Sequence, residues 1–156
     1  MSTSTIPRIL VIHGPNLNTL GHREPHIYGN VTLESLHERL AERARELHCT
    51  VSPFQSNHEG AIIDLLQSEA STAAGIVINP GGLTHTSVSL RDALAATGLP
   101  AVEVHLSNVY RREPMRHHSM IADVVAARIM GFGAEGYALA LRGVSDLVEA
   151  ARAKRT

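Results

Sequence analysis

ILVIHGPNLNTLGHREPHIY, residues 9–28, joins a short apolar strand to a polar loop and so indicates the fold class. The apolar run Ile9–Ile12 is followed at once by HGPN at residues 13–16, and the loop beyond carries Arg23 and Tyr28. Open α/β sheets bind ligands just beyond the carboxyl ends of their strands. We therefore expect a site at this point, with Tyr28 and Arg23 as a candidate proton-abstracting pair.

Apolar runs alternate with amphipathic segments along the rest of the chain. Further strand-like runs occupy residues 50–55, 75–79 and 101–105, with a weaker one at 127–131. Five strands joined by helices in so short a chain predict a doubly wound α/β fold. The commonest solution at this size is a flavodoxin-like parallel sheet of order 2-1-3-4-5. We expect one domain over residues 1–156, with 1–6 and 152–156 disordered.

The helical segments between these strands carry recognisable boundary residues. Thr32 is a suitable N-cap for the first amphipathic segment, and Ser56 or Asn57 for the second. Gly98 and Pro100 mark the end of the third. These boundaries support the alternation of strands and helices.

The composition excludes several classes of partner and compartment. The 14 Lys+Arg against 15 Asp+Glu leave a net charge of −1, which favours neither nucleic acid nor an anionic membrane as partner. No apolar run approaches the roughly 20 residues of a membrane span. Cys49 is the single cysteine and cannot form an intrachain disulfide, so a reducing cytoplasm is the expected location.

Two counts limit the chemistry. Lys154, the single lysine, lies in the polar tail, whereas Schiff-base catalysis needs a buried lysine. The ten histidines invite a metal site, but His37-Glu38 and His58-Glu59 both lack the second histidine of the zinc-protease pattern. We therefore expect no metal and no other cofactor.

Polar residues follow the predicted strands in a repeated pattern. They are Asn16, Asn57, Asn79 and His105. The carboxyl ends of parallel strands lie at one edge of the sheet, so these side chains are expected to converge there. The backbone amides of Leu106 and Ser107 could bind an anionic group at this edge, and Arg112 and Arg116 could add positive charge.

Simpler explanations exist for each residue alone. A single asparagine is often only a cap, Gly81-Gly82 a turn, an arginine cluster a solvated surface, and His105 a core histidine. A flavin carrier is disfavoured because Pro15 removes an amide from the first loop and aromatic residues are scarce. A phosphoacceptor receiver domain is disfavoured because the required carboxylates are missing. A purely structural module would not need so many polar groups at one edge.

Four motifs, in order along the chain, resemble those of type II 3-dehydroquinate dehydratase, the type II dehydroquinase. They are GPNLN (14–18) with REPHIYG (23–29); QSNHEG (55–60); NPGGLTHTS (79–87) with Asp92; and EVHLSN (103–108) continuing through REPMRHHS (112–119). The resemblance extends from about residue 9 to 147. It departs from the usual pattern at His13, where Asn is usual, at Tyr110, where His is common, and at Arg128, in a strand that is usually small and apolar.

The resemblance implies loss of water from 3-dehydroquinate to give 3-dehydroshikimate, in the shikimate pathway or in quinate catabolism. A tyrosinate at Tyr28 would remove the proton beside the ketone, Asn16 would hold a water on the resulting enolate, and His105, oriented by Glu103, would protonate the departing hydroxyl. A phenol has an ordinary pKa of about 10, and one nearby cation lowers a pKa by about 1–3 units. Arg23 alone is therefore borderline, and Arg112 is a candidate second cation.

The resemblance also assigns substrate binding and assembly. The family's carboxylate site implies the backbone of Leu106 and Ser107, and ring hydroxyls would be held by Asn79, His85 and Arg116. The implied assembly is a homododecamer, a tetramer of trimers, in which Asp92 of a neighbouring subunit completes each site. The alternative from another class is a ligand-binding or regulatory protein that keeps the fold without turnover.

Overall fold

A computed structural model describes residues 5–22, 26 and 30–155. Its centre is a five-stranded sheet in which every neighbouring pair of strands is parallel. The strands are β1 (Arg8–His13), β2 (Thr50–Gln55), β3 (Gly75–Asn79), β4 (Ala101–His105) and β5 (Ala127–Met130). Their order, β2-β1-β3-β4-β5, confirms the predicted flavodoxin-like topology.

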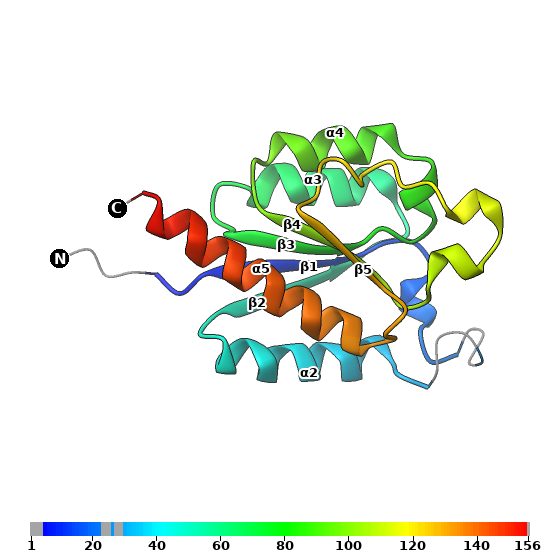
Figure 1. The fold of residues 1–156 in the computed structure, drawn as a ribbon, viewed down its shortest axis with the longest axis horizontal. Coiled ribbons are helices and arrows are strands. Elements are labelled where there is room, and N and C mark those ends of the chain that lie inside the picture. The colour runs from blue at the N-terminus through cyan, green and yellow to red at the C-terminus, as the bar shows by residue number, and fades with distance from the viewer. Residues whose placement is uncertain (1–4, 23–25, 27–29, 156) are drawn as a thin grey trace.

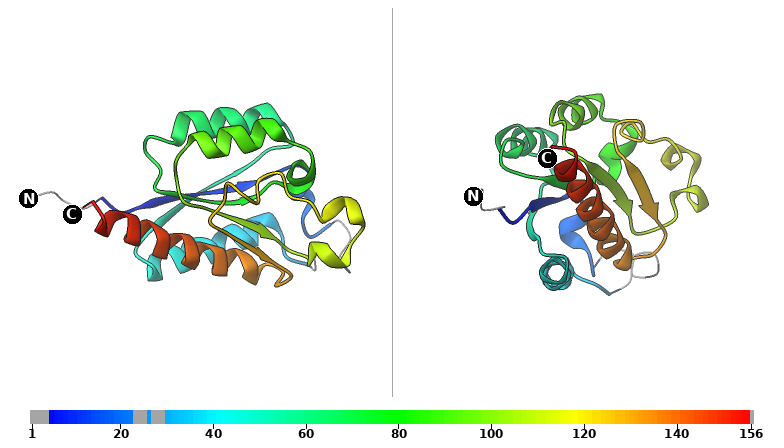
Figure 2. Two further views of the ribbon diagram at one scale, coloured as in Figure 1. Left: turned by 45° about the horizontal axis from the view of Figure 1, so that its top comes forward. Right: turned by 60° about the vertical axis from the view of Figure 1, so that its left-hand side comes forward.

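Helices cover both faces of the sheet. In the views of Figures 1 and 2, α3 and α4 lie on one face, and α2 and α5 lie on the other. The bounds of these helices are α2 (Leu33–Glu46), α3 (Glu59–Glu69), α4 (Val88–Ala96) and α5 (Glu135–Ala153). Each face has its own apolar core, and β3 and β4 are buried at every position because they lie between the two cores.

The helix boundaries agree with the sequence at some positions and differ at one. Thr32 caps α2 through a capping box with Ser35, as its residue type predicts. The predicted cap of α3 by Ser56 or Asn57 is wrong, since the N-cap is His58 without a side-chain bond. The oxygen of Ser56 instead accepts from the amide of His58, and that of Asn57 accepts from the amide of Asn16.

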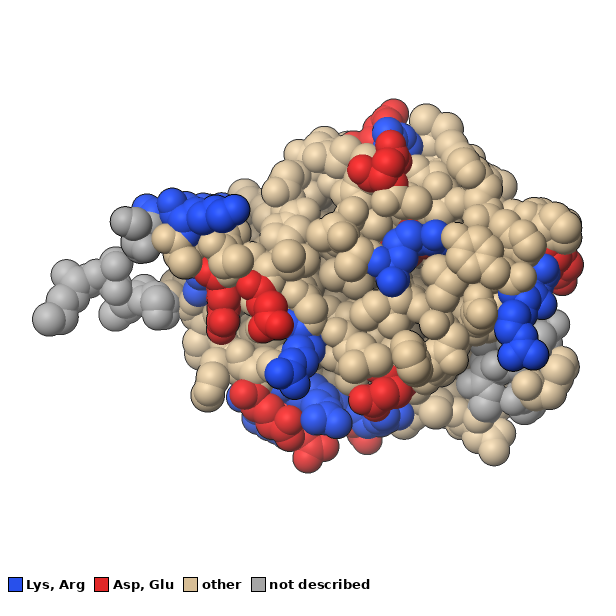
Figure 3. Space-filling view, viewed as in Figure 1, with Lys and Arg blue, Asp and Glu red and all other residues tan. Residues whose placement is uncertain are grey.

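Both ends of the described chain lie at the amino end of the sheet. Helix α5 continues to Ala153 and so includes the first residues of the tail that we expected to be disordered. Arg152 donates through Nη1 to the carbonyl of Thr5 at 3.0 Å. On the face in Figure 3, the described basic and acidic side chains are interspersed, in keeping with the balanced net charge.

The loops after β1 and β3 are in direct backbone contact. The amide of Gly14 donates to the carbonyl of Asn79 at 2.8 Å. A Cβ atom on Gly14 would lie 2.1 Å from the carbonyl oxygen of Pro80, well inside van der Waals contact. Glycine is therefore required at this position so that the two loops can approach each other.

We predict that Gly14→Ala lowers the free energy of unfolding by about 3 kcal/mol, because backbone atoms cannot yield as a flexible side chain can. Gly82→Ala is the matched control: it lies on the neighbouring loop, where a Cβ atom meets nothing within 4 Å. Urea denaturation of both variants measures the difference. Equal stabilities for the two variants would show that the close contact is unimportant.

Candidate active site

A pocket lies at the carboxyl ends of β1, β3 and β4. The structure brings together in its lining most of the residues predicted to form the site: Asn16, Asn79, His85, His105, Leu106, Ser107, Arg112 and Arg116. Pro15, Gly81 and Gly82 line it as well, so the two loops joined at Gly14 form one wall. Their convergence follows from the topology, because parallel strands direct the loops after them to one edge of the sheet.

Asn16 is held by the ends of the neighbouring strands. Its backbone is left-handed, with φ of 72°, and its amide donates to Asn57 Oδ1 at 2.9 Å. Gln55 donates through Nε2 to the same oxygen and to the carbonyl of Gly14, both at 3.2 Å. Asn57, expected at this edge, thus supports the backbone of Asn16 and does not line the pocket.

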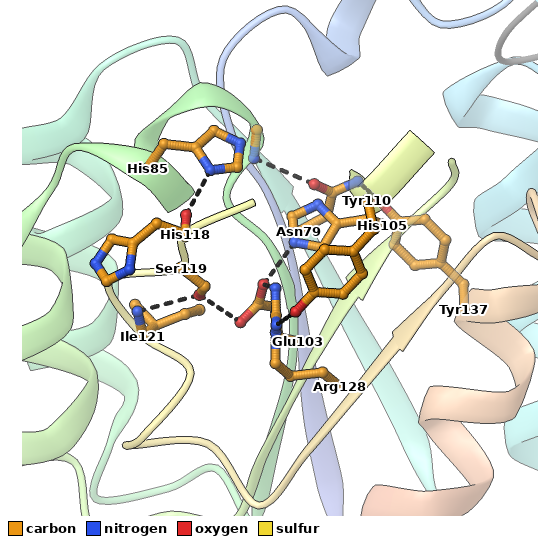
Figure 4. A network of polar contacts seen from close by, with 11 residues as sticks. Asn79, His85, Glu103, His105, Tyr110, His118, Ser119, Ile121, Arg128 and Tyr137 are labelled. Carbon is orange, nitrogen blue, oxygen red and sulfur yellow. Dashed lines mark hydrogen bonds and ion pairs between the residues drawn. The ribbon is translucent and has the colours of Figure 1, made fainter. Parts of the chain in front are cut away.

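His105 and Glu103 form a buried pair on β4. His105 Nε2 lies 2.6 Å from Glu103 Oε2, and the Glu103 side chain has no exposed surface (Figure 4). Burial acts to raise the pKa of Glu103, but the hydrogen bonds and charge of its partners outweigh burial and lower it. A carboxylate only accepts, so Nε2 of His105 carries a hydrogen, and Nδ1 is the ring nitrogen that is not bound to Glu103.

Two further side chains bind the Glu103 carboxylate. Ser119 donates through Oγ to Oε1 at 2.8 Å, and Arg128 donates through Nη2 to Oε2 at 3.1 Å (Figure 4). Nη1 of Arg128 also donates to the hydroxyl of Tyr110 at 3.3 Å, so the unusual residues at 110 and 128 contact each other. Sequence reasoning missed this role, although an arginine inside an apolar strand is itself a sign of a buried acid nearby.

Asn79 and His85 have fixed orientations at the pocket. Asn79 accepts at Oδ1 from the amide of Gly81 and donates through Nδ2 to Tyr137 Oη, both at 3.1 Å. His85 Nδ1 donates to the carbonyl of His118 at 2.7 Å, which leaves its Nε2 as an acceptor. Burial, with the positive charges of His105 and Arg116, lowers the pKa of His85 despite its bond to His118.

Arg112 and Arg116 contribute the positive charge of the pocket. Arg116 is oriented by a 2.6 Å bond from its Nε to Oε2 of Glu113, the N-cap of the short 3-10 helix Pro114–Arg116. Both arginines line the pocket together with Leu106 and Ser107. An anionic group of a small ligand can therefore meet both cations and backbone there.

Comparison with known proteins agrees with this geometry. The family described as Dehydroquinase class II matches residues 7–145. The chain belongs to this family. A "3-dehydroquinate dehydratase" of Acaryochloris marina is 56% identical over 88% of this chain and 93% of the relative. "Catabolic 3-dehydroquinase 1" of Aspergillus fumigatus is 53% identical over 88% and 91%.

A solved structure supports the same assignment. The crystal structure of type II dehydroquinase from Butyrivibrio crossotus superposes with a TM-score of 0.86 at 46% identity, covering 88% of this chain and 97% of the other. Fold and sequence therefore both place the chain among the class II dehydroquinases.

One predicted substrate-binding residue lies outside the pocket, and two predicted catalytic residues are not described by the structure. Asp92 lies on α4, is exposed, and is absent from the pocket lining. Tyr28 and Arg23 lie outside the described residues. Within the ranges that the structure describes, no three His, Cys, Asp or Glu side chains lie close enough to hold a metal ion, and no helix is suited to cross a membrane.

His13, where this chain departs from the usual dehydroquinase pattern, is fully buried at the end of β1. Its Nδ1 lies 3.0 Å from Tyr137 Oη, and its Nε2 lies 2.9 Å from Nε2 of His37 on α2. Burial, and next the nearby His37, lowers the pKa of His13 to about 3. The imidazole is therefore neutral in the folded protein at physiological pH.

This lowered pKa predicts a loss of stability in acid. Above pH 6.5 the imidazole of His13 is neutral in both folded and unfolded chains. As the pH falls from 6.5 towards 3, the unfolded chain binds a proton that the folded chain does not. Stability should fall by about 1.4 kcal/mol per pH unit from this group, or about 2 kcal/mol by pH 5.

His13→Asn should remove this part of the acid sensitivity. Urea unfolding at pH 7.5 and pH 5 measures it, with His48→Asn as the matched control because His48 is an exposed histidine. An unchanged difference between the two pH values in His13→Asn would contradict the prediction.

Proposed function

We propose that this protein is a type II 3-dehydroquinate dehydratase that eliminates water from 3-dehydroquinate without a metal, imine or other cofactor. The observation that carries the proposal is the buried His105–Glu103 pair, which faces a polar pocket in a chain that belongs to the dehydroquinase family. The names of the relatives include both a dehydratase and a catabolic dehydroquinase, so the proposal covers either pathway.

The proposed reaction moves two protons. Tyr28, as a tyrosinate, takes a proton from the carbon beside the ketone, and the electron pair of that bond forms an enolate. Asn16 holds a water against the enolate oxygen. The enolate then reforms the ketone and expels the hydroxyl, which takes a proton from His105 and leaves as water. Glu103 would support His105 as the proton donor, because a carboxylate beside an imidazole stabilises the protonated form of the imidazole.

The charge of the pocket supports the proposed base. Arg23, five residues before Tyr28 in the sequence, together with Arg112 in the pocket lining, would favour the tyrosinate over the phenol at Tyr28. The substrate carboxylate would meet the backbone of Leu106 and Ser107.

The ring hydroxyls would meet Asn79, His85 and Arg116. His85 is suited to accept from one of them because its Nε2 has no proton when the ring is neutral. Binding of the whole ring thus uses neutral acceptors as well as cations.

The direct test is to incubate purified protein with 3-dehydroquinate and follow the ultraviolet absorbance of the conjugated product. We expect turnover, and we expect Tyr28→Phe to fold normally and lose about 10²–10⁴-fold in kcat, because the base is absent. A wild-type protein that binds substrate without forming product would support the ligand-binding alternative. A Phe variant with more than about a tenth of wild-type kcat would exclude Tyr28 as the base.

We further propose one catalytic domain over residues 1–156, a cytoplasmic location and a homododecamer built from four trimers. The location is supported by the lone, buried Cys49, which has no intrachain partner. Shared sites are supported by Asp92, which is exposed on α4 and lies outside the pocket of its own chain. A carboxylate in that place can serve a site on a neighbouring subunit.

Mixing inactive Tyr28→Phe chains with inactive Asp92→Ala chains tests the shared site. After joint reassembly we expect activity to return, because some trimers contain a site with both native residues. Reassembly of each variant alone is the control. No recovery in mixed oligomers, verified by native mass spectrometry, would place Asp92 outside the catalytic site, and a monomer at micromolar concentration would exclude the assembly.

A further inference from the structure

Three buried polar groups next to the pocket have no part in the proposed reaction. They are His13 on β1, Tyr137 on α5 and, at the half-buried end, His37 on α2. His13 and Tyr137 have no exposed surface. Their polar atoms form a continuous series of contacts of 2.9–3.1 Å that begins at Asn79 and ends at His37.

The orientation of the Asn79 carboxamide is fixed at both ends. The Gly81 amide can only donate, so the atom that faces it is Oδ1. Nδ2 therefore faces Tyr137 and donates to its hydroxyl, and Figure 4 shows the two side chains directed toward each other. A carboxamide turned by 180° would face Gly81 with a donor and lose that bond.

The hydrogen bonds of the series also have a direction. Burial raises the pKa of Tyr137, so it stays a phenol with one hydrogen, and His13 stays neutral with one N–H. If Tyr137 donates to Nδ1 of His13, then Nε2 of His13 donates to His37 and every group has a partner. In the reverse direction the Tyr137 hydrogen has no acceptor within the series, and an unpaired buried donor is costly.

We propose that Tyr137, His13 and His37 are positioning residues, which hold the Asn79 carboxamide in the one orientation that binds substrate. This inference rests on the proposed function, because it concerns the ring hydroxyl that Asn79 would bind. A hydroxyl can donate to the oxygen of a carboxamide or accept from its nitrogen, so a carboxamide that turns freely exchanges the donor and the acceptor that the substrate hydroxyl meets. The series removes that freedom.

The series also accounts for the pairing of His13 with His37 in this chain. His13 lies opposite Asn79 in the β1–β3 register, so its ring is beside the residue that it positions. Its second nitrogen is too deeply buried to bind bulk water, and His37 supplies the acceptor from the covering helix α2. The chain of contacts thus ends at a side chain that reaches the surface.

A double-mutant cycle on KM and kcat tests the proposal. Tyr137→Phe keeps the ring packing and removes the hydroxyl, and we expect KM to rise about 10-fold with a smaller change in kcat. In an Asn79→Ala background the same substitution should change KM by less than about 2-fold, because the group it positions is absent. Multiplicative effects of the two substitutions on KM would overturn the proposal.

Substitutions of His37, the half-buried end of the series, give a second test in which the core is not disturbed. His37→Gln retains an acceptor for His13, whereas His37→Leu covers the same nitrogen with an apolar group of similar size. We expect KM to rise about 3-fold for Leu and to stay near wild type for Gln. Equal KM values for the two variants would remove His37 from the series.

The wild-type arm separates this inference from the proposed function. A wild-type protein without turnover overturns the proposed function, and the positioning role falls with it. If the wild type is active but the effects of Tyr137→Phe and Asn79→Ala on KM multiply in the double mutant, only the positioning role is overturned.

Discussion

The backbone contact between the ends of β1 and β3 is the constraint on which the pocket depends. The parallel register places His13 opposite Asn79, and Gly14 then donates to the carbonyl of Asn79 at 2.8 Å. This bond brings the loop that carries Asn16 against the loop that carries Gly81. Any side chain at position 14 would separate the loops, so the geometry of the site is decided by a position that has no side chain of its own.

The other wall of the pocket depends on a buried charge. A carboxylate with no exposed surface costs several kcal/mol in desolvation unless it is paired. Glu103 is paired with His105, Arg128 and Ser119, which together supply donors to both of its oxygens. Arg128 compensates the charge of Glu103 from outside the pocket, and its contact with Tyr110 joins two positions at which the sequence led us to expect departures from the family pattern.

Much of this could be predicted from the sequence, and the parts that could not have a common physical reason. Strand positions and the cap at Thr32 follow from local patterns, and the convergence of Asn16, Asn79 and His105 follows from topology. The bond from Tyr137 to His13 joins residues 124 positions apart. Helical spacing alone identifies Tyr137 only as part of a buried face, since no local pattern records which hydroxyl meets which imidazole.

The two walls of the pocket differ in the charge of the buried groups behind them. On the β4 side, partners that lower the pKa of Glu103 keep it charged, and it accepts a hydrogen bond from the imidazole of His105. On the β3 side, burial lowers the pKa of His13 to about 3 and raises the pKa of Tyr137, so both groups are neutral at physiological pH and form neutral hydrogen bonds.

This difference bears on the base as well. Tyr137 is unsuited to be a tyrosinate because its hydroxyl is buried among neutral partners. Tyr110 is exposed, is bound to Arg128 and does not line the pocket. The two tyrosines that the structure describes are thus both unsuited to act as the base, which supports the proposal that Tyr28, the third tyrosine of the sequence, takes the proton.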